Sequence, residues 1–348
     1  MTRVAVLPGD GIGREVVPAA VEVLGDLGLG LEFEPFDVGA ERFLATGQAL
    51  PDGEFADVCG ADAVLLGAIG DPRISDPRYT AQVLSRLRSG LDVYANVRPA
   101  RLFADRLTPL RAVERAGVDL VVVRENTEGL YAGVGGRFRR GTPEEVAVQH
   151  HINTARGVER VLEYAFRAAR RAVCMVDKWN AMPDAGGLWQ ERFRTVASRH
   201  PSIAAEHLMI DAACLHLVRD PAQFDVIVTE NCFGDILSDL AAELAGGLGV
   251  APSANLNPET GRGLFEPVHG SAPDIAGRGV ANPAAAILTG ALLLRHLGFA
   301  EEAGAVEAAV ASAIRDGECT RDLGGSLSTA EAAAAVRRRV GWAVPGRR

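Results

Sequence analysis

The sequence predicts an α/β protein, because segments typical of buried strands alternate along the chain with segments typical of amphipathic helices. Residues 4–7, 63–66 and 118–124 are short runs rich in β-branched or aliphatic side chains, and a helical pattern follows several of these runs. The length of 348 residues is sufficient for two domains or for one large α/β unit. A hydrophobic content of 48% with 23% charged residues is typical of a soluble globular enzyme.

The net charge, the cysteine count and the distribution of apolar residues argue against several classes of function. The net charge of −9 argues against a nucleic-acid partner. The cysteines are scattered, odd in number and without a CxxC pair, which indicates free thiols in a reducing compartment rather than a disulfide framework or a zinc site. The N-terminus has no signal-peptide pattern, and every long apolar stretch is interrupted by charge or is too short to span a membrane. We therefore expect a cytoplasmic protein with no membrane partner.

The first strand, 4–7, leads into the glycine-rich segment PGDGIG (8–13) and a helix that reaches about residue 27. Val17, Val21 and Leu24 give this helix one apolar face. The glycines follow the spacing G-x-G-x-G rather than G-x-G-x-x-G, so the dinucleotide fingerprint of a Rossmann fold is not met. A tight turn with close backbone approach is the interpretation that the glycines support.

The second strand, 63–66, ends in GAIGDP (67–72), a glycine-containing loop at the carboxyl end of a strand, where α/β sites usually lie. The pattern continues through further strands and helices in alternation. The strands expected after it are 118–124 and 172–178, and the helices are about 81–89, 154–171, from about 187, 282–297, 301–315 and 328–339.

The segment FDVIVTENCFGDILSD (224–239) combines a strand with an acidic helix. Residues 226–228 form the strand, 231–234 break it, and the following helix carries Asp235 and Asp239 one turn apart on the same face. Two adjacent carboxylates repel each other unless a cation lies between them, and hard divalent ions take such oxygen ligands. A solvated acidic face is the alternative. With Asp211 as a third acid, the pattern favours a Mg²⁺ or Mn²⁺ site.

Three arginines stand at the edges of predicted elements, and their planar guanidinium groups suit a small di- or tricarboxylate. They are Arg88 near a helix end, Arg98 before a proline and Arg124 at the end of a strand. Surface arginines are the alternative. Tyr131 and Lys178 are candidates for an acid–base pair, although a strand-end lysine can also simply extend into solvent. His269 is either a cofactor contact or a hydrogen-bonded loop histidine.

Five segments together, in this order, resemble the isocitrate/3-isopropylmalate dehydrogenase family of β-decarboxylating, metal-dependent 2-hydroxy acid dehydrogenases. They are PGDGIG, LDVYANVRP, VVVRENTEGLY, TENCFGDILSDLA and EPVHGSAPDIAGRGVANP. The resemblance covers nearly the whole chain and is strongest to the bacterial 3-isopropylmalate dehydrogenases. It implies two α/β domains that share a large mixed sheet, with a non-Rossmann cofactor site. The cofactor-binding domain would comprise 1–97 and 250–348, and the substrate, metal and dimerisation domain would comprise 98–249.

The resemblance also implies a reaction and a set of site residues. The reaction would be the NAD-dependent oxidative decarboxylation of (2R,3S)-3-isopropylmalate to 4-methyl-2-oxopentanoate and CO₂ in leucine biosynthesis. It would require Mg²⁺ or Mn²⁺, with K⁺ as an optional further ion. The family forms homodimers in which each site takes its lysine and one metal aspartate, here Lys178 and Asp211, from the neighbouring subunit. Lys178 would take the hydroxyl proton and Tyr131 would protonate the enolate.

By the same resemblance, substrate contacts would come from Leu84, Ser85, Arg88, Arg98, Arg124, Asn180 and Asp211, and metal ligands from Asp211, Asp235 and Asp239. The cofactor would be held by Ile12, Gly70, His269, Gly270, Ser271, Ala272, Asp274, Ile275 and Asn282. Asp274 matches the position where NAD-dependent members carry an acid, which would repel the 2′-phosphate of NADP. The sequence therefore favours NAD.

The helix before Arg88 departs from the usual family patterns for choosing the γ-substituent. Ala81 and Ser85 stand where isopropylmalate enzymes usually carry a glutamate and a second leucine, while Leu84 keeps one apolar contact. Gln82 stands where isocitrate enzymes carry a serine. Homoisocitrate, isocitrate, D-malate, tartrate or another 3-substituted malate therefore remain alternative substrates. A non-catalytic subunit of a hetero-oligomer is the alternative from another class, and the complete set of acid, base and arginine positions argues against it.

Overall fold

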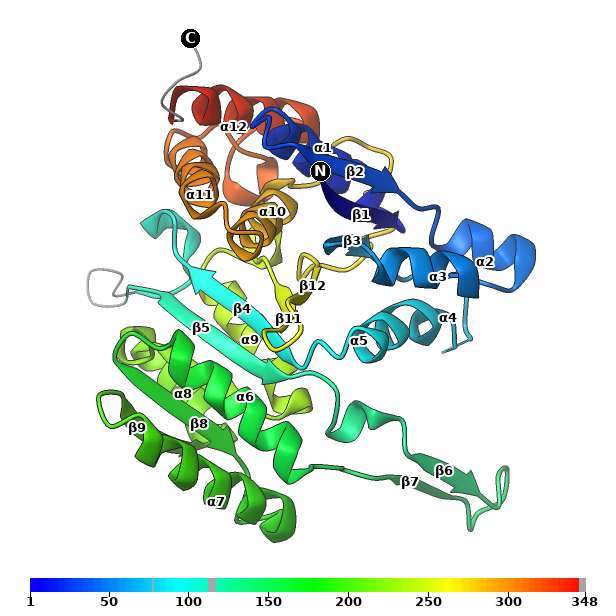
Figure 1. The fold of residues 1–348 in the computed structure, drawn as a ribbon, viewed down its shortest axis with the longest axis vertical. Coiled ribbons are helices and arrows are strands. Elements are labelled where there is room, and N and C mark those ends of the chain that lie inside the picture. The colour runs from blue at the N-terminus through cyan, green and yellow to red at the C-terminus, as the bar shows by residue number, and fades with distance from the viewer. Residues whose placement is uncertain (77, 112–116, 344–348) are drawn as a thin grey trace. The chain divides into compact units, whose positions relative to one another are not determined.

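The computed structural model describes residues 1–76, 78–111 and 117–343, and it divides into two compact units (Figure 1). The first unit comprises Met1–Val93, Arg101–Pro109 and Ala242–Arg348, and the second comprises Tyr94–Ala100 and Leu110–Ala241. Each unit combines a layer of strands with covering helices. Among the described residues, no helix has both the length and the apolar character that a membrane crossing requires.

The strands of the first unit run in the order β2-β1-β3-β12-β11. β1 is parallel to β2 and β3, β12 is parallel to β3, and only β11 runs antiparallel to its neighbour β12. These strands are β1 (Thr2–Gly9), β2 (Leu31–Pro35), β3 (Ala63–Ala68), β11 (Ala254–Asn257) and β12 (Arg262–Phe265).

Both faces of this sheet are buried. Along β1, Val4 and Val6 enter one hydrophobic cluster, and Ala5 and Leu7 enter another. Successive strand residues point to opposite faces, so a strand covered on both sides has no polar alternation. This explains why the predicted strands 4–7 and 63–66 are uninterrupted apolar runs, and both predictions are confirmed.

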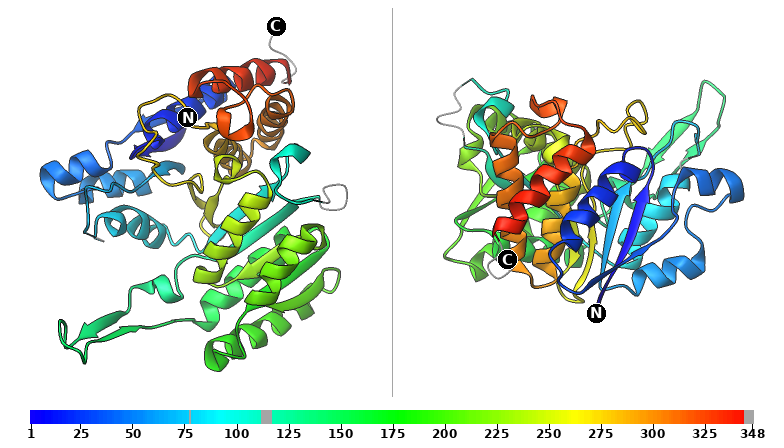
Figure 2. Two further views of the ribbon diagram at one scale, coloured as in Figure 1. Left: turned by 180° about the vertical axis from the view of Figure 1, so that it is seen from behind. Right: turned by 90° about the horizontal axis from the view of Figure 1, so that it is seen from above.

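One face of the first unit is covered by a packed group of helices, in which α1 contacts α10 and α12, and α11 contacts α10 and α12 (Figure 2). The predicted helices in these places are confirmed within a few residues. The bounds are α1 (Gly13–Gly25), α10 (Ala284–His296), α11 (Ala300–Arg315) and α12 (Thr329–Ala343).

A second hydrophobic cluster of the first unit contains residues of α3 and α5 together with Ala5 and Leu7 of β1. The helix expected at about 81–89 lies here, and a π-helical turn, η1 (Ala81–Ser85), stands between its α-helical segments α4 and α5. Such turns insert an extra residue per turn and are frequent at functional sites. The helices are α2 (Ala40–Thr46), α3 (Asp52–Cys59), α4 (Arg78–Thr80) and α5 (Arg86–Gly90).

The strands of the second unit run in the order β4-β5-β10-β8-β9, and the last four are parallel. Figures 1 and 2 show α6 and α7 on one face of these strands and α9 on the other. The strands are β4 (Ala95–Arg101), β5 (Asp119–Glu125), β8 (Ala172–Asp177), β9 (Ala204–Met209) and β10 (Val226–Thr229). The helices are α6 (Ala155–Ala168), α7 (Pro183–Arg199), α8 (Ile210–Arg219) and α9 (Asn231–Leu244).

Two helices of the second unit begin earlier than predicted. α9 starts at Asn231 rather than after Gly234, because the Glu230 carboxylate accepts the backbone N–H groups of Cys232 and Phe233, each at 2.9 Å. This caps amide groups that have no partner within the helix. α7 starts at Pro183 rather than near Gly187, because proline is well tolerated in the first turn of a helix.

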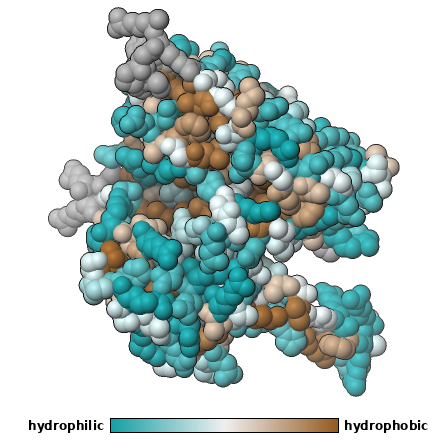
Figure 3. Space-filling view, in the orientation of Figure 1, coloured by the Kyte–Doolittle hydropathy of each residue, from teal (hydrophilic) through white to brown (hydrophobic). Residues whose placement is uncertain are grey.

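A two-stranded hairpin, β6 (Gly135–Phe138) and β7 (Val146–Gln149), was not predicted. Its strands are short, and β6 begins with two glycines, so they carry little strand signal. Figure 3 shows hydrophobic side chains on its surface, and the Phe138 and Val146 residues are 60% and 50% exposed. The hairpin therefore presents apolar side chains to solvent.

Candidate functional site

Asp235 and Asp239, on one side of α9, form a carboxylate–arginine cluster with Arg98 of β4 and Arg124 of β5. The Arg124 guanidinium donates directly to Asp235. The Arg98 Nη1 atom lies 3.3 Å from Asp239 Oδ1, and its Nη2 atom lies 3.5 Å from Asp235 Oδ1. The structure therefore brings the two helix acids together with two of the three arginines within the second unit.

Neighbouring polar groups fix both arginines, which are 9% and 2% exposed. Arg98 donates from Nε to Asn96 Oδ1 at 2.9 Å and from Nη1 to Ser238 Oγ at 2.8 Å. Arg124 donates from Nε and Nη2 to Asn231 Oδ1 at 3.0 and 2.7 Å. Buried guanidinium groups that keep their donors paired are held in one orientation, which is what the recognition of a small anion requires.

The negative charge of Asp235 acts on the neighbouring carboxyl group of Asp239. Burial is the main cause that raises the pKa of Asp239 above its usual value, and the negative charge of Asp235 adds to it. The Asp235 and Asp239 side chains nevertheless remain 39% and 55% exposed. Two accessible carboxylates one turn apart supply the oxygen ligands that a divalent cation prefers.

Tyr131, in the short turn η4 (Leu130–Ala132), joins the same cluster. Its hydroxyl donates to Asp235 Oδ2 at 3.4 Å, and the Arg124 guanidinium lies 5.6 Å from the centre of its ring. Burial raises the pKa of Tyr131 to about 12, helped by the Cys232 thiol and by the charge of Asp235. At neutral pH the phenol therefore keeps its proton and can act as an acid.

Lys178 and Asp211 form a separate pair in the second unit. Lys178, directly after β8, donates from Nζ to Asp211 Oδ1 at 2.7 Å, and this hydrogen bond lowers the pKa of Asp211. Asn180 is exposed in the turn that follows. No group of three His, Cys, Asp or Glu side chains suited to a metal forms among the described residues, so within one chain Asp211 does not complete the pair on α9.

Arg88 lies in the first unit, where its Nη2 atom donates to Glu266 Oε1 at 2.6 Å. On the turn before it, Leu84 is partly buried against the hydrophobic cluster of that unit and Ser85 is exposed. Gln82 accepts the Ala49 backbone N–H at 2.9 Å. The Gln82 side chain therefore binds a neighbouring loop of the first unit through this hydrogen bond.

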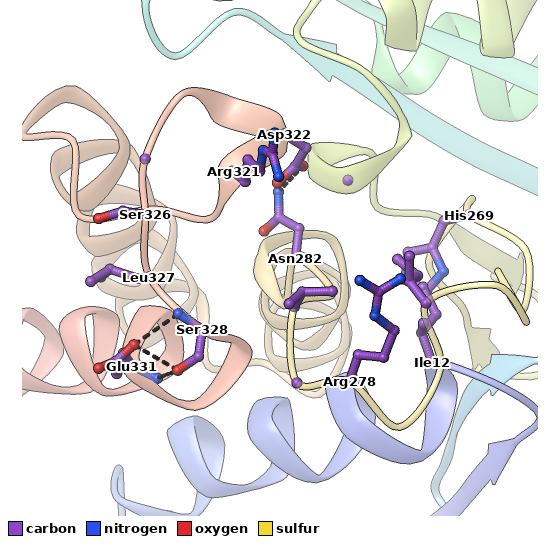
Figure 4. Close-up of a pocket in the computed structure, with 15 residues that line it drawn as sticks. Ile12, His269, Arg278, Asn282, Arg321, Asp322, Ser326, Leu327, Ser328 and Glu331 are labelled. Atoms are coloured by element: carbon purple, nitrogen blue, oxygen red, sulfur yellow. Dashed lines mark hydrogen bonds between the residues drawn. The ribbon is translucent and has the colours of Figure 1, made fainter.

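The first unit contains a cavity of about 1100 Å³ between its helices and the segment around 269–282 (Figure 4). Of the cofactor residues expected from the sequence, it is lined by Ile12, His269, Ile275 and Asn282. Gly70 lines a second cavity of about 440 Å³ in the same unit. Neither lining includes Gly270, Ser271, Ala272 or Asp274.

Polar groups on the wall of the larger cavity are held in defined positions. Asn282 donates to Asp322 Oδ2 at 2.8 Å, and Thr320 donates to Asp322 Oδ1 at 2.5 Å. Burial lowers the pKa of His269, so its ring is neutral at neutral pH. The His269 Nε2 atom is buried, and no residue in the described part of the chain accepts from it or donates to it. A buried polar atom of this kind indicates a missing partner.

Several residues on this wall were not identified from the sequence, namely Arg278, Arg321, Asp322, Ser326, Ser328 and Glu331. Ser328 and Glu331 carry a signal that could have located them, because S-x-x-E before an apolar run marks a capped helix start. The Ser328 N–H and hydroxyl both donate to the Glu331 carboxylate, at 2.8 and 2.7 Å. Of the other four, Arg278 lies within the segment EPVHGSAPDIAGRGVANP, Arg321 and Asp322 lie in a short 3-10 helix, η7 (Arg321–Leu323), and Ser326 lies in the loop after it.

Comparisons with known proteins agree with these observations. The sequence profile described as isocitrate/isopropylmalate dehydrogenase matches residues 3–336. The chain is 48% identical to the 3-isopropylmalate dehydrogenase of Streptomyces griseus subsp. griseus over 93% of this chain and 96% of that protein. It is 50% identical to the 3-isopropylmalate dehydrogenase of Leifsonia xyli subsp. xyli, over 91% and 92%.

Solved structures show the same fold and confirm the predicted class. The isocitrate dehydrogenase from Methylococcus capsulatus superimposes with a TM-score of 0.89 at 40% identity, covering 98% of this chain and 99% of that one. The beta-decarboxylating dehydrogenase TK0280 from Thermococcus kodakarensis gives 0.81 at 37% identity, with coverages of 98% and 96%. The profile match, the sequence identities and the shared fold agree with one another, and the chain belongs to the isocitrate/isopropylmalate dehydrogenase family.

Proposed function

We propose that this enzyme oxidises and decarboxylates a 3-substituted malate with NAD⁺, and that 3-isopropylmalate is its substrate. One observation carries the proposal. The two accessible carboxylates of α9 contact two buried arginines and a protonated tyrosine. This cluster occurs in a chain that is about half identical to proteins named 3-isopropylmalate dehydrogenase.

The residues fit a divalent cation. Asp235 and Asp239 supply oxygen ligands, and the raised pKa of Asp239 reflects burial and crowding of negative charge that a cation would relieve. Asp211 of a second copy would complete the set. With a cation held by the two carboxylates, the guanidinium groups of Arg98 and Arg124 would be available to hold the substrate carboxylates.

The first unit fits a dinucleotide. The cavity of about 1100 Å³ can enclose adenosine, and the buried Nε2 atom of His269 lacks a partner among the described residues. Asp274, expected to select NAD, is exposed and is not part of the cavity lining. Asp322 does line it, and a carboxylate at this wall would repel a 2′-phosphate. We therefore retain NAD as the proposed cofactor, with Asp322 as an acid that favours it.

When bound, the cation would polarise the substrate oxygens and stabilise the enolate, and NAD⁺ would accept the hydride. Lys178 would take the hydroxyl proton as a neutral amine, so its ammonium group, which donates to Asp211, would first have to release a proton to solvent. Tyr131, which keeps its proton at neutral pH, would protonate the enolate carbon after CO₂ leaves. Arg98 and Arg124 would hold the carboxylates in the orientation that these transfers need.

The γ-substituent would lie near the π-helical turn, Ala81–Ser85, which carries no charged residue. Arg86, the next residue, is directed to the Asp52 carboxylate and the Leu50 carbonyl. A γ-carboxylate such as that of isocitrate would find no positive partner on this turn, whereas an isopropyl group could contact Leu84. The small side chains of Ala81 and Ser85 also leave room for a bulkier or more polar substituent, which keeps another 3-substituted malate as the alternative.

A substrate panel tests this proposal. The purified protein with NAD⁺ and Mg²⁺ is expected to form NADH fastest from 3-isopropylmalate when homoisocitrate, isocitrate, D-malate and tartrate are supplied at equal concentrations. Treatment with EDTA should abolish the rate, and added Mg²⁺ or Mn²⁺ should restore it, because the carboxylates are the proposed ligands.

A higher kcat/KM for isocitrate would refute the substrate assignment. An unchanged rate in EDTA would refute the metal site. No turnover with any acid of the panel would favour a non-catalytic subunit instead.

We also propose a homodimer, because Asp211 does not join Asp235 and Asp239 within one chain, and a second copy would supply it together with Lys178. Besides the hairpin β6–β7, the exposed residues of α8 and α9 include Leu215, Val218 and Ile236, at 58%, 49% and 53%. Exposed apolar side chains on helices of this kind can be buried at an interface between two copies of the chain. Light scattering should give twice the chain mass of 36.7 kDa, and a monomer in the active preparation would contradict shared sites.

A further inference from the structure

The segment that follows His269 separates the two cavities of the first unit. Ile275, Arg278 and Gly279 line the larger cavity, whereas Pro273, Ala276 and Gly277 line the smaller one. This loop therefore forms a shared wall between the two cavities. Its position helps to determine the shape of the larger cavity, which is the proposed dinucleotide pocket.

Glu15, in the first turn of α1, holds this loop through both of its carboxylate oxygens. Oε1 accepts the Gly277 N–H at 2.5 Å and Oε2 accepts the Gly279 N–H at 2.9 Å. Both glycines have positive φ angles, +76° and +63°, which glycine adopts without strain. On the opposite side, the Thr329 N–H donates to the Gly279 carbonyl at 2.9 Å. The loop is therefore fixed from α1 and from α12.

Arg278 lies between the two amides that Glu15 binds. Figure 4 shows its guanidinium group extending into the cavity on the side of Ile12 and His269. Within residues 1–76, 78–111 and 117–343 this guanidinium forms no ion pair or side-chain hydrogen bond. The cavity carboxylates are already engaged, Asp322 by Asn282 and Thr320, and Glu331 by Ser328. The cavity therefore contains a positive charge that no described residue neutralises.

We propose that Arg278 contacts a phosphate group of the bound dinucleotide and that Glu15 is a positioning residue that holds Arg278 in place. The proposal rests on the proposed use of NAD⁺. A guanidinium group binds phosphate oxygens through two parallel hydrogen bonds, and a backbone that is already held in place lowers the entropic cost of binding. The paired amide bonds of Glu15 on either side of Arg278 supply that constraint.

Calorimetry with three probes tests the phosphate contact, because NAD⁺ and 5′-AMP carry phosphate and adenosine does not. Arg278→Ala should weaken the binding of NAD⁺ and 5′-AMP by about tenfold or more, as expected for a charge-assisted hydrogen bond, and leave adenosine unchanged. Arg315→Ala is the matched control, because Arg315 is an exposed arginine of the same unit at the end of α11, and this variant should bind all three probes as the unchanged protein does.

A double-mutant cycle tests the positioning role. Glu15→Gln keeps one acceptor of the two and should weaken 5′-AMP binding by about threefold or more. Combined with Arg278→Ala, it should have no further effect, because the residue that it positions is absent. Combined with Arg321→Ala, which removes the other cavity arginine, its effect should persist. Glu301→Gln, in the first turn of α11, is the matched control and should change nothing.

Three results would overturn the inference. Unchanged 5′-AMP binding by Arg278→Ala would remove the phosphate contact. An equal loss of adenosine and 5′-AMP would show a general collapse of the pocket, and additive effects of Glu15→Gln and Arg278→Ala would show that Glu15 does not act through Arg278. If the unchanged protein binds no NAD⁺, the proposed function itself is wrong. Failure of the variants to behave as expected while the unchanged protein still binds NAD⁺ refutes only this inference.

Discussion

Replacing Asp235 with asparagine is expected to lower kcat/KM by about 10³-fold or more, the largest loss for any single substitution in the second unit. Asp235 contacts Arg124, Arg98 and Tyr131, and it is one of the proposed metal ligands. Loss of an anionic ligand removes several kcal/mol of charge stabilisation in the transition state, and about 4 kcal/mol corresponds to this fall in rate. The rate should be measured with saturating Mg²⁺ and NAD⁺.

The same variant should bind Mn²⁺ at least about tenfold more weakly in a titration without substrate, because a neutral amide oxygen replaces a carboxylate. The control is Asp220→Asn, an exposed aspartate of the same unit, which should keep the full rate. Turnover by Asp235→Asn within tenfold of the unchanged protein would show that the carboxylates of α9 are not the metal site.

The strands buried on both faces could be predicted from the sequence because their apolar runs are continuous. The same was true of the helices with a clear apolar face, such as α1. The start of α9 could not be predicted, because the side chain that caps it belongs to Glu230, and glutamate has no strong preference for that position. The hairpin β6–β7 was missed because exposed strands need no apolar pattern and leave no periodic signal.

For the candidate site, the types of side chain could be predicted from the sequence, but the residues that each side chain contacts could not. Asp235 and Asp239 were predicted as a pair because helix spacing alone places them together. That Lys178 contacts Asp211 depends on the approach of β8 to α8, which local sequence does not encode. Asp274 was identified because it stands in a recognisable motif, whereas Asp322, which lines the cavity, stands outside the motifs and was not considered. Contacts between distant segments are set by tertiary packing, and no local pattern reports them.

A methyl group added at Gly234 is expected to disable the site through packing rather than chemistry. A Cβ atom at this position would lie 2.6 Å from Cβ and from Cγ of Arg124, a side chain that is 3% exposed. Helix propensity favours alanine by about 1 kcal/mol, but overpacking of this kind costs about 1–3 kcal/mol. Gly234→Ala should therefore lower the free energy of unfolding and reduce kcat by about 10²-fold, since Asp235 is the next residue and would be displaced.

Gly187→Ala provides the opposite expectation, because Gly187 also lies in a helix but a Cβ atom added there would have no described atom within 4 Å. The higher helix propensity of alanine is not offset by a steric clash at this position. The free energy of unfolding should therefore rise by roughly 0.5–1 kcal/mol, with activity unchanged. Urea denaturation and initial rates of both variants would measure the two effects. If both glycines respond alike, close contact between α9 and Arg124 does not determine the geometry of the site. Opposite signs would show that the glycine lets α9 pack closely enough for its carboxylates to reach both arginines.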